Sequence, residues 1–312
     1  MSEKSFDVVS IGDCVMDCLF YVDRMPKMAE TMTANDFELF PGGKGANVCI
    51  AAARLGSKNA FVCKLGHDMF GKNFISILQS EKINIDHVSF TDKAPTSVAS
   101  IMVDPKGNNS IAVNFGATLQ LNERDIDKAE DLIKKCKVLI TSMVVKGATA
   151  LHSLKLAKKH NLITVFNFAP AIKDLDPEFN KYVDLLVVNE VEAEVFTGSS
   201  VKSVEEAEKA CQVVLAREGF EIGVVVTLGE KGCVFGNKKN GDIKHYPGKK
   251  VKVVDSTGAG DAFCGSLSHF IGKCDIYQAI ELASSYASLT VQHKGTQASY
   301  PCIDNLDLSF RI

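Results

Sequence analysis

The sequence has almost no excess of charge of either sign. Its 35 lysines and arginines nearly balance 38 aspartates and glutamates, for a formal net charge of −3 at pH 7. Proteins that bind nucleic acid or anionic membrane surfaces rely on a basic field, and this chain has none. We therefore expect no nucleic acid and no membrane among its partners.

Long apolar runs and a secretory leader are also missing. The run from Val8 to Ile11 is too short to cross a bilayer, and the first residues lack the basic and apolar regions of a signal peptide. Ten cysteines are scattered through apolar segments, and no second Cys/His pair extends Cys14 and Cys18 into a zinc site. These features indicate reduced thiols in a cytoplasmic protein.

Internal repeats, low-complexity tracts and Pro/Ser-rich linkers are absent, and 46% hydrophobic residues suffice for a large core. Short β-type runs alternate with amphipathic helical stretches, which predicts an α/β fold: a central, mostly parallel sheet with helices packed against it. The predicted strands are 6–11, 59–64, 138–141, 163–167, 185–188, 222–227 and 250–254. The predicted helices are 45–55, 70–80, 123–134, 148–159, 190–196, 204–217 and one from about 259.

Two stretches break this alternation. In the second, two β-type runs flank Asp104-Pro-Lys-Gly-Asn-Asn109, which has strong turn chemistry and predicts a hairpin. Strands without helices of their own must bury one face elsewhere, so we expect a small β-sheet that acts as a lid or a dimer contact. The predicted division is a main α/β domain of residues 1–13, 41–95 and 118–312, with a small β lid of 14–40 and 96–117.

The most informative segment is Asp255-Ser-Thr-Gly-Ala-Gly-Asp261, a Gly-rich turn that opens a long apolar helix. Unpaired backbone N–H groups at a helix N-terminus stabilise the negative charge of a phosphoryl group. A carboxylate beside such a phosphate can accept the proton of an attacking hydroxyl, which makes Asp261 a candidate general base. The alternative is that Asp261 only complements the helix dipole.

A second glycine cluster, Pro41-Gly-Gly-Lys-Gly-Ala-Asn47, precedes an Ala-rich helix. Its glycines allow close approach to a ligand, with Lys44 and Asn47 as donors to hydroxyls or phosphate; a tight turn with a helix cap explains it equally well. Neither glycine cluster fits the dinucleotide pattern G-x-G-x-x-G or the phosphate-binding loop pattern G-x-x-x-x-G-K-[ST]. The sequence therefore disfavours a Rossmann dinucleotide-binding protein and a P-loop nucleotide-binding protein.

Two further loops follow predicted strands at the edge of the sheet where open α/β folds bind ligands. In Asn189-Glu-Val-Glu192, Glu192 is a candidate ligand of hydrated Mg²⁺, although acids at a helix start are by default favourable with its dipole. The other loop, Thr227-Leu-Gly-Glu-Lys-Gly232, offers close approach at the same edge.

Together and in this order, the segments resemble the PfkB (ribokinase-like) family of carbohydrate and nucleoside kinases. Residues 42–47 resemble its first signature and residues 255–261 its second, while Asn189-x-x-Glu192 resembles its Mg-linked motif. The segments Asn167-Phe-Ala-Pro-Ala171 and Lys294-Gly-Thr-Gln-Ala-Ser-Tyr-Pro301 are most similar to the ribokinase branch.

The resemblance implies a cofactor set and a role for each matching residue. It implies ATP, Mg²⁺ and an activating K⁺, a nucleotide-binding main domain whose sheet has helices on both faces, and a lid over the substrate site that often mediates dimers. Asp261 would be the base, with the amides of Gly258, Ala259 and Gly260 as the anion hole. The substrate would contact Asp17, Gly43, Lys44 and Asn47. The water network that links Mg²⁺ to the phosphates would involve Asn189 and Glu192, and the nucleotide would contact Asn189, Thr227, Gly229 and Gly232. The K⁺ ion would be surrounded by Asp255, Thr257, Thr290, His293, Gly295 and Ser299.

Two positions depart from the usual ribokinase pattern and bear on the substrate. Val15 stands where many bacterial members have Asn, and Val144 lies in the loop where a family Glu contacts the sugar. Losing a polar partner costs about 1–3 kcal/mol for each buried polar group left unpaired. We expect transfer of the γ-phosphate to a hydroxymethyl group, with D-ribose favoured; the alternatives are a nucleoside kinase, in which Met143 and Phe115 would also face the base, and a non-catalytic sugar sensor.

Overall fold

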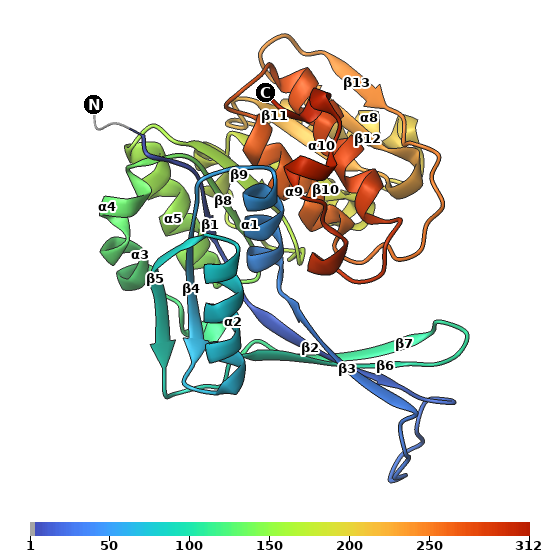
Figure 1. Ribbon diagram of the computed structural model, residues 1–312. Helices are drawn as coiled ribbons and strands as arrows, with labels where there is room; N and C mark the ends of the chain where they lie inside the picture. The colour runs from blue at the N-terminus through green and yellow to red at the C-terminus, as the bar shows by residue number, and fades with distance from the viewer. Residues whose placement is uncertain (1–3) are drawn as a thin grey trace.

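The computed structural model describes residues 4–312, and its centre is a nine-stranded sheet with the order β13-β12-β11-β10-β9-β8-β1-β4-β5 (Figure 1). The seven strands from β11 to β5 are parallel, and β12 and β13 extend one edge in antiparallel pairing. The strands are β1 Phe6–Ile11, β4 Asn59–Gly66, β5 Asn84–Thr91, β8 Cys136–Ser142, β9 Ile163–Asn167, β10 Leu185–Asn189, β11 Gly223–Thr227, β12 Cys233–Asn237 and β13 Ile243–Tyr246.

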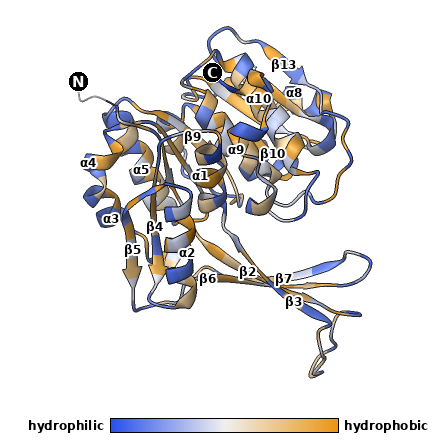
Figure 2. Cartoon of the chain, viewed as in Figure 1, coloured by the Kyte–Doolittle hydropathy of each residue, from blue (hydrophilic) through white to orange (hydrophobic). Residues whose placement is uncertain are grey.

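Helices cover both faces of this sheet, because side chains alternate between two hydrophobic clusters along each strand. Val8 of β1 lies in one cluster and Val9 in the other, both fully buried. Figure 2 shows the hydrophobic strands between the helical layers. One cluster includes α1 Lys44–Arg54, α2 Met69–Ser80, α9 Ala259–Phe270 and α10 Ile276–Thr290; the other includes α3 Glu123–Lys128, α4 Glu130–Ile133, α5 Gly147–Lys159, α6 Phe179–Tyr182, α7 Glu190–Thr197 and α8 Val204–Leu215.

The α/β prediction is confirmed, with local corrections. The predicted helix 123–134 is two helices that meet at Ala129, where the backbone leaves helical geometry at φ −89° and ψ 0°. The predicted strand 250–254 is irregular, because no neighbouring strand pairs with it and Val253 and Val254 are exposed. Within residues 4–312, no helix is long and apolar enough to span a membrane. All ten cysteines are free thiols.

The two inserted stretches form a second, four-stranded sheet with the order β3-β2-β6-β7. Its strands are β2 Val15–Tyr21, β3 Asp36–Gly42, β6 Ser97–Val103 and β7 Asn109–Asn114. The antiparallel pairing of β6 with β7 confirms the predicted hairpin. This small sheet projects from the body of the molecule, with the start of β2 and the end of β3 nearest to it (Figure 1).

Close contact between α1 and α9 brings the two glycine-rich segments together. Gly265 of α9 makes this contact possible, because a Cβ there would lie 2.4 Å from the Val48 carbonyl oxygen and 2.8 Å from the Ala51 Cβ. Both segments start helices, so their packing places the first turn of α1 beside the first turn of α9.

We predict that Gly265→Ala destabilises the protein by about 1–3 kcal/mol, because the new methyl group must push apart two packed helices. Gly272→Ala is the matched control, since a Cβ at Gly272 meets nothing within 4 Å. Urea unfolding of both variants measures the difference, and equal midpoints would contradict the proposed packing constraint.

Candidate active site

The loop after β1 contacts the first turn of α1, which lies beside the first turn of α9, and the helix that follows β10 carries Glu192 near both. At the centre is Asp261, which is 6% exposed and lies in the first turn of α9. The Asn47 amide donates a hydrogen bond of 2.8 Å to Asp261 Oδ2, and Lys44 Nζ lies 3.9 Å from Oδ1. Burial raises the pKa of Asp261, while Lys44 and then Asn47 lower it. Asp261 Oδ1 accepts no hydrogen bond within residues 4–312, so it is available to accept a proton. A buried carboxylate with a raised pKa suits that role.

A second buried carboxylate, Asp13, was missed by the sequence analysis. It is 2% exposed, and its Oδ1 accepts a hydrogen bond of 2.8 Å from the Gly45 amide, while its carbonyl accepts one from the Ala46 amide. Since Gly43 at the N-cap of α1 has no side chain, Asp13 caps this helix from the loop after β1. The available signal was an acid at the end of the apolar run 8–11, the position that loops use for ligands.

Asp13, Asp17 and Asp261 form a cluster of carboxylates with mutually unfavourable charges. Burial, followed by the charges of Asp13 and Asp261, raises the pKa of Asp17 to about 6. Burial also raises the pKa of Asp13 to about 6, with the Gly45 amide opposing and the charge of Asp261 adding to the rise. Lys44 is the cation among them, and Asp261 raises its pKa.

The glycines of the first signature serve backbone contact within the protein. Gly43 adopts φ +92°, and a Cβ there would lie 2.7 Å from the Val15 amide nitrogen. A Cβ at Gly42 would lie 2.5 Å from Asp17 Oδ2. This segment therefore holds the loop after β1 and the Asp17 carboxylate in place.

The loop before α9 is the candidate anion hole. Gly258 is the N-cap at φ +77°, and a Cβ there would lie 2.2 Å from Thr296 Cγ2. The Ala259 amide already donates to the Ser256 carbonyl at 3.2 Å. Gly260 has open space around its Cα, and within residues 4–312 neither its amide nor that of Asp261 has a hydrogen-bond acceptor. Of the three predicted amides, those of Gly258 and Gly260 are therefore free within residues 4–312, and the Asp261 amide is a further free donor.

Asn189 and Glu192 form a reciprocal capping box at the start of α7. Asn189 Oδ1 accepts from the Glu192 amide at 2.8 Å, and Glu192 Oε2 accepts from the Asn189 amide at 2.9 Å. Glu192 therefore stabilises the start of α7 through Oε2. Its other oxygen, Oε1, has no hydrogen-bond partner within residues 4–312. Burial raises the pKa of Glu192, and Lys44 lowers it, so Glu192 faces the same site.

The loop after β11 contains two glycines with different surroundings. Gly229 adopts φ +54°, and a Cβ there would meet nothing within 4 Å, whereas a Cβ at Gly232 would lie 2.0 Å from the Tyr246 carbonyl oxygen. Thr227 Oγ1 donates to the Val188 carbonyl at 3.3 Å. Gly229 thus borders open space, while Gly232 is needed for backbone packing against the end of β13.

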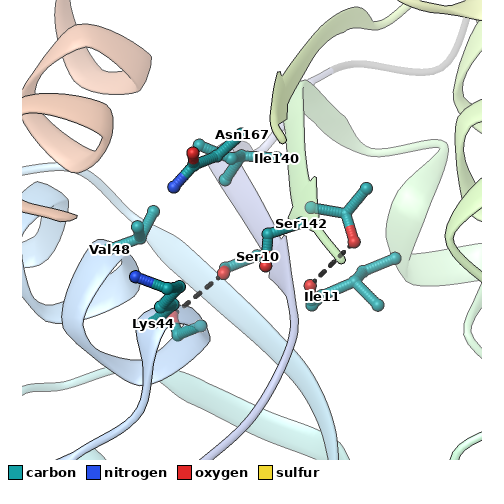
Figure 3. Close-up of a pocket in the computed structure, with 9 residues that line it drawn as sticks. Ser10, Ile11, Lys44, Val48, Ile140, Ser142 and Asn167 are labelled. Carbon is teal, nitrogen blue, oxygen red and sulfur yellow. Dashed lines mark hydrogen bonds between the residues drawn. The ribbon is translucent and has the colours of Figure 1, made fainter. Parts of the chain in front are cut away.

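Figure 3 shows a small pocket next to Lys44, lined by the carboxyl ends of β1, β8 and β9. Ser10 Oγ donates to the Gly45 carbonyl at 3.0 Å and so ties β1 to α1. Asn167 and Ser142 are 8% and 5% exposed, and their side chains have no hydrogen-bond partner in the part of the chain that the structure describes. Two nearly buried polar groups beside Lys44 were not assigned from the sequence.

The residues implied for K⁺ lie on two adjoining segments, the loop before α9 and the stretch from the end of α10 to Ser299. Asp255 Oδ2 accepts from the Gly295 amide and Oδ1 from the Thr257 amide, both at 2.9 Å. Thr290 and Ser299 are buried, and their hydroxyls donate to the Ala287 and Thr296 carbonyls. His293 is exposed. Residues 4–312 contain no group of three His, Cys, Asp or Glu side chains that would hold a metal ion.

Val15 and Val144 are both buried, at 6% and 3% exposure. Val144 packs in the hydrophobic cluster below Gly12, with its Cγ2 3.8 Å from where a Gly12 Cβ would lie. The loss of polarity at position 144 is therefore compensated by core packing.

Fold and site together define a phosphotransferase that acts on an alcohol group. The chain belongs to the pfkB family of carbohydrate kinases, whose family model matches residues 5–302. It is 39% identical to the ribokinase of Mus musculus over 310 residues, which cover 98% of this chain and 95% of that protein. It is 36% identical to the deoxyribokinase of Salmonella typhi, with 96% and 97% covered.

Solved structures agree with this assignment. The ribokinase of Arabidopsis thaliana complexed with ribose and ATP superimposes with a TM-score of 0.91 at 25% identity, covering 98% of this chain and 99% of that one. The ribokinase of Thermotoga maritima gives a TM-score of 0.85 at 29% identity, with 98% of each chain covered.

We predict that Asp13→Asn stabilises the protein at pH 8 by about 1–3 kcal/mol, since a pKa shift of one unit corresponds to about 1.4 kcal/mol. Asparagine keeps the acceptor for the Gly45 amide but removes a buried charge. In the wild type, burial raises the pKa of Asp13 to about 6 in the folded state, from 3.8 in the unfolded chain. Wild-type stability from this group therefore rises as pH falls from 7 to 4, and the advantage of the variant disappears.

Thermal unfolding at pH 8 and at pH 4 measures this difference. The control is Asp174→Asn, which removes the charge of an exposed carboxylate. An Asp13→Asn variant that melts like the wild type at pH 8 would show that the buried charge carries no such cost.

Proposed function

We propose that this protein transfers the γ-phosphate of ATP to D-ribose, forming ribose 5-phosphate. The observation that carries the proposal is the Asp261 carboxylate, buried at the N-terminus of α9 between the Asn47 amide and Lys44. The similarity to proteins named ribokinase, over nearly the full chain, supports ribose as the acceptor. ATP and Mg²⁺ follow from membership of the kinase family.

In the proposed mechanism, Asp261 accepts the proton of the ribose hydroxymethyl group as its oxygen attacks the γ-phosphorus. The new O–P bond forms as the bond to the β-phosphate oxygen breaks, and ADP leaves. The amides at the start of α9 and the Lys44 ammonium offset the charge on the transferred group. Mg²⁺ would neutralise phosphate charge, and the free oxygen of Glu192 suits a Mg²⁺-bound water.

For the nucleotide, we assign Asn189, Thr227 and Gly229, which lie at adjoining carboxyl ends of β10 and β11. The open space at Gly229 supports a close backbone approach there. Gly232 is given a structural role instead, because its backbone packs against Tyr246.

We assign the four-stranded sheet as a lid over the sugar, with Asp17 and Asn47 contacting its hydroxyls. Asp17 pairs with Phe40 on β3 and with Ala99 on β6, so these three side chains share one face of the sheet. Glu38 lies on the same face and accepts a hydrogen bond of 3.0 Å from Lys294 of the main domain. A closed lid would exclude water from the transfer step.

The opposite face of this sheet supports a homodimer. It carries Cys18, Phe20, Phe37 and Leu39 on adjoining strands. Phe37 and Leu39 are 48% and 44% exposed. A second copy of the chain would cover this apolar face.

We also propose a K⁺ site between the loops 255–257 and 290–299, which the Gly295–Asp255 hydrogen bond holds together. Carbonyl, hydroxyl and carboxylate oxygens are the donors that these loops offer, in keeping with a hard cation. Because the first loop leads into the anion hole, the ion would order the donors of α9.

The test of the proposed function is turnover of ATP to ADP with ribose, 2-deoxyribose, fructose, adenosine, inosine or cytidine. We expect ribose to give the highest kcat/KM.

We further expect Asp261→Asn to lower kcat by about 10²–10⁴, the usual contribution of a general base, while the amide keeps an oxygen for the Asn47 donor. Preference for a nucleoside or for deoxyribose would reassign the acceptor, and near-normal turnover of Asp261→Asn would remove the base.

We predict that replacing K⁺ by tetramethylammonium at constant ionic strength lowers kcat severalfold, and that Asp255→Asn reduces this response. Initial rates in the two salts measure the effect. Identical rates in both salts would rule out the cation site.

A further inference from the structure

The Asn47 amide that contacts Asp261 is itself oriented by a second side chain. Gln297 Nε2 donates a hydrogen bond of 2.9 Å to Asn47 Oδ1, and Asn47 Nδ2 donates one of 2.8 Å to Asp261 Oδ2. The three side chains are 4%, 5% and 6% exposed in order from Gln297 to Asp261. The result is a buried, directional chain of amides that ends on the carboxylate.

An asparagine amide has two faces with opposite hydrogen-bonding character. Only one orientation of Asn47 presents its NH₂ group to Asp261; the flipped orientation would present a carbonyl oxygen to a carboxylate. The donor from Gln297 requires an acceptor on Asn47 and therefore selects the productive orientation. Within the described part of the chain, the Asn47 side chain forms hydrogen bonds with Gln297 and Asp261 and with no other residue.

Gln297 is placed for this task by the same helix that carries Asn47. Arg54, at the end of α1, donates to the backbone carbonyls of Gln297 and Tyr300 and pairs with Glu81 at 2.6 Å. The Tyr300 hydroxyl in turn donates to the Gly258 carbonyl at 2.9 Å. The turn 297–300 thus joins both ends of α1 to the N-cap of α9.

We propose that Gln297 is a positioning residue for phosphoryl transfer, which fixes the Asn47 amide so that it orients and stabilises the Asp261 carboxylate. The inference rests on the proposed function for its kinetic consequence, since Gln297 touches no reacting atom. Its contribution is exerted entirely through Asn47.

Gln297→Met tests this assignment, because methionine has similar length and no donor. We expect kcat to fall by about 10- to 100-fold, with KM for ATP nearly unchanged, since a misplaced catalytic group costs up to about 10². Introduced into Asn47→Ala, the same change should cost no further activity. An equal loss in both backgrounds would mean that Gln297 acts on the fold and would overturn the proposal.

The pH profile supplies a second readout. Without the oriented Asn47 donor, the acidic limb of kcat/KM should move to higher pH. The other titratable groups near Asp261 are unchanged in the variant: Lys44 on α1, Asp13 after β1, Asp17 on β2, Glu192 on α7, Cys264 on α9 and Tyr300 after α10. Gln212→Met, at an exposed site on α8, is the control and should leave rate and profile unchanged.

A measurement on the unaltered protein separates this inference from the proposed function. In samples labelled with ¹⁵N-asparagine, the Asn47 side-chain amide signals should titrate with Asp261 and exchange slowly with solvent. Rapid exchange, or equal signals in Gln297→Met, would overturn the orientation role whether or not ribose is the acceptor. A wild type that fails to phosphorylate ribose but shows the slow exchange would sink only the proposed function.

Discussion

The contact between α1 and α9 is the constraint on which the site depends. It places Asn47 against Asp261 across 214 residues of sequence, and it is possible only because Gly265 lets the Val48 carbonyl come close. Lys44 occupies the same first turn of α1, so one packing contact sets the position of the base, its hydrogen-bond donor and its cation. The turn at Gln297 then secures the arrangement from the side.

This arrangement gathers charge that a folded protein normally avoids. Asp13 and Asp261 are buried, Asp17 beside them is half-buried, and the pKa of each is raised mainly by the partial or full loss of water around it. Lys44 offsets part of that cost. A polyhydroxylated acceptor would add donors to these carboxylates and replace the lost water, so stability given up in building the site is recovered in affinity for hydroxyl groups.

Much of the fold was predictable because hydrophobic periodicity is a local property. The strand 163–167 and the helix beginning at 204 follow directly from it. The irregular conformation of residues 250–254 could not be predicted in this way, because it depends on the absence of a neighbouring strand in the tertiary structure. For the site, the motifs located Asp261 and Asn47, whereas Asp13 and Gln297 owe their roles to partners 32 and 250 residues away that spacing does not indicate.

Glycine-rich signatures are ambiguous for a related physical reason. A glycine is needed wherever backbone approaches backbone, and that neighbour is as often the protein as a ligand. At Gly43, Gly232 and Gly258 a Cβ would collide with the chain itself, so these glycines build the loops. At Gly229 and Gly260 the space is open, which leaves room for phosphate oxygens. The signature therefore combines two kinds of position, and only the second kind reports directly on what the protein binds.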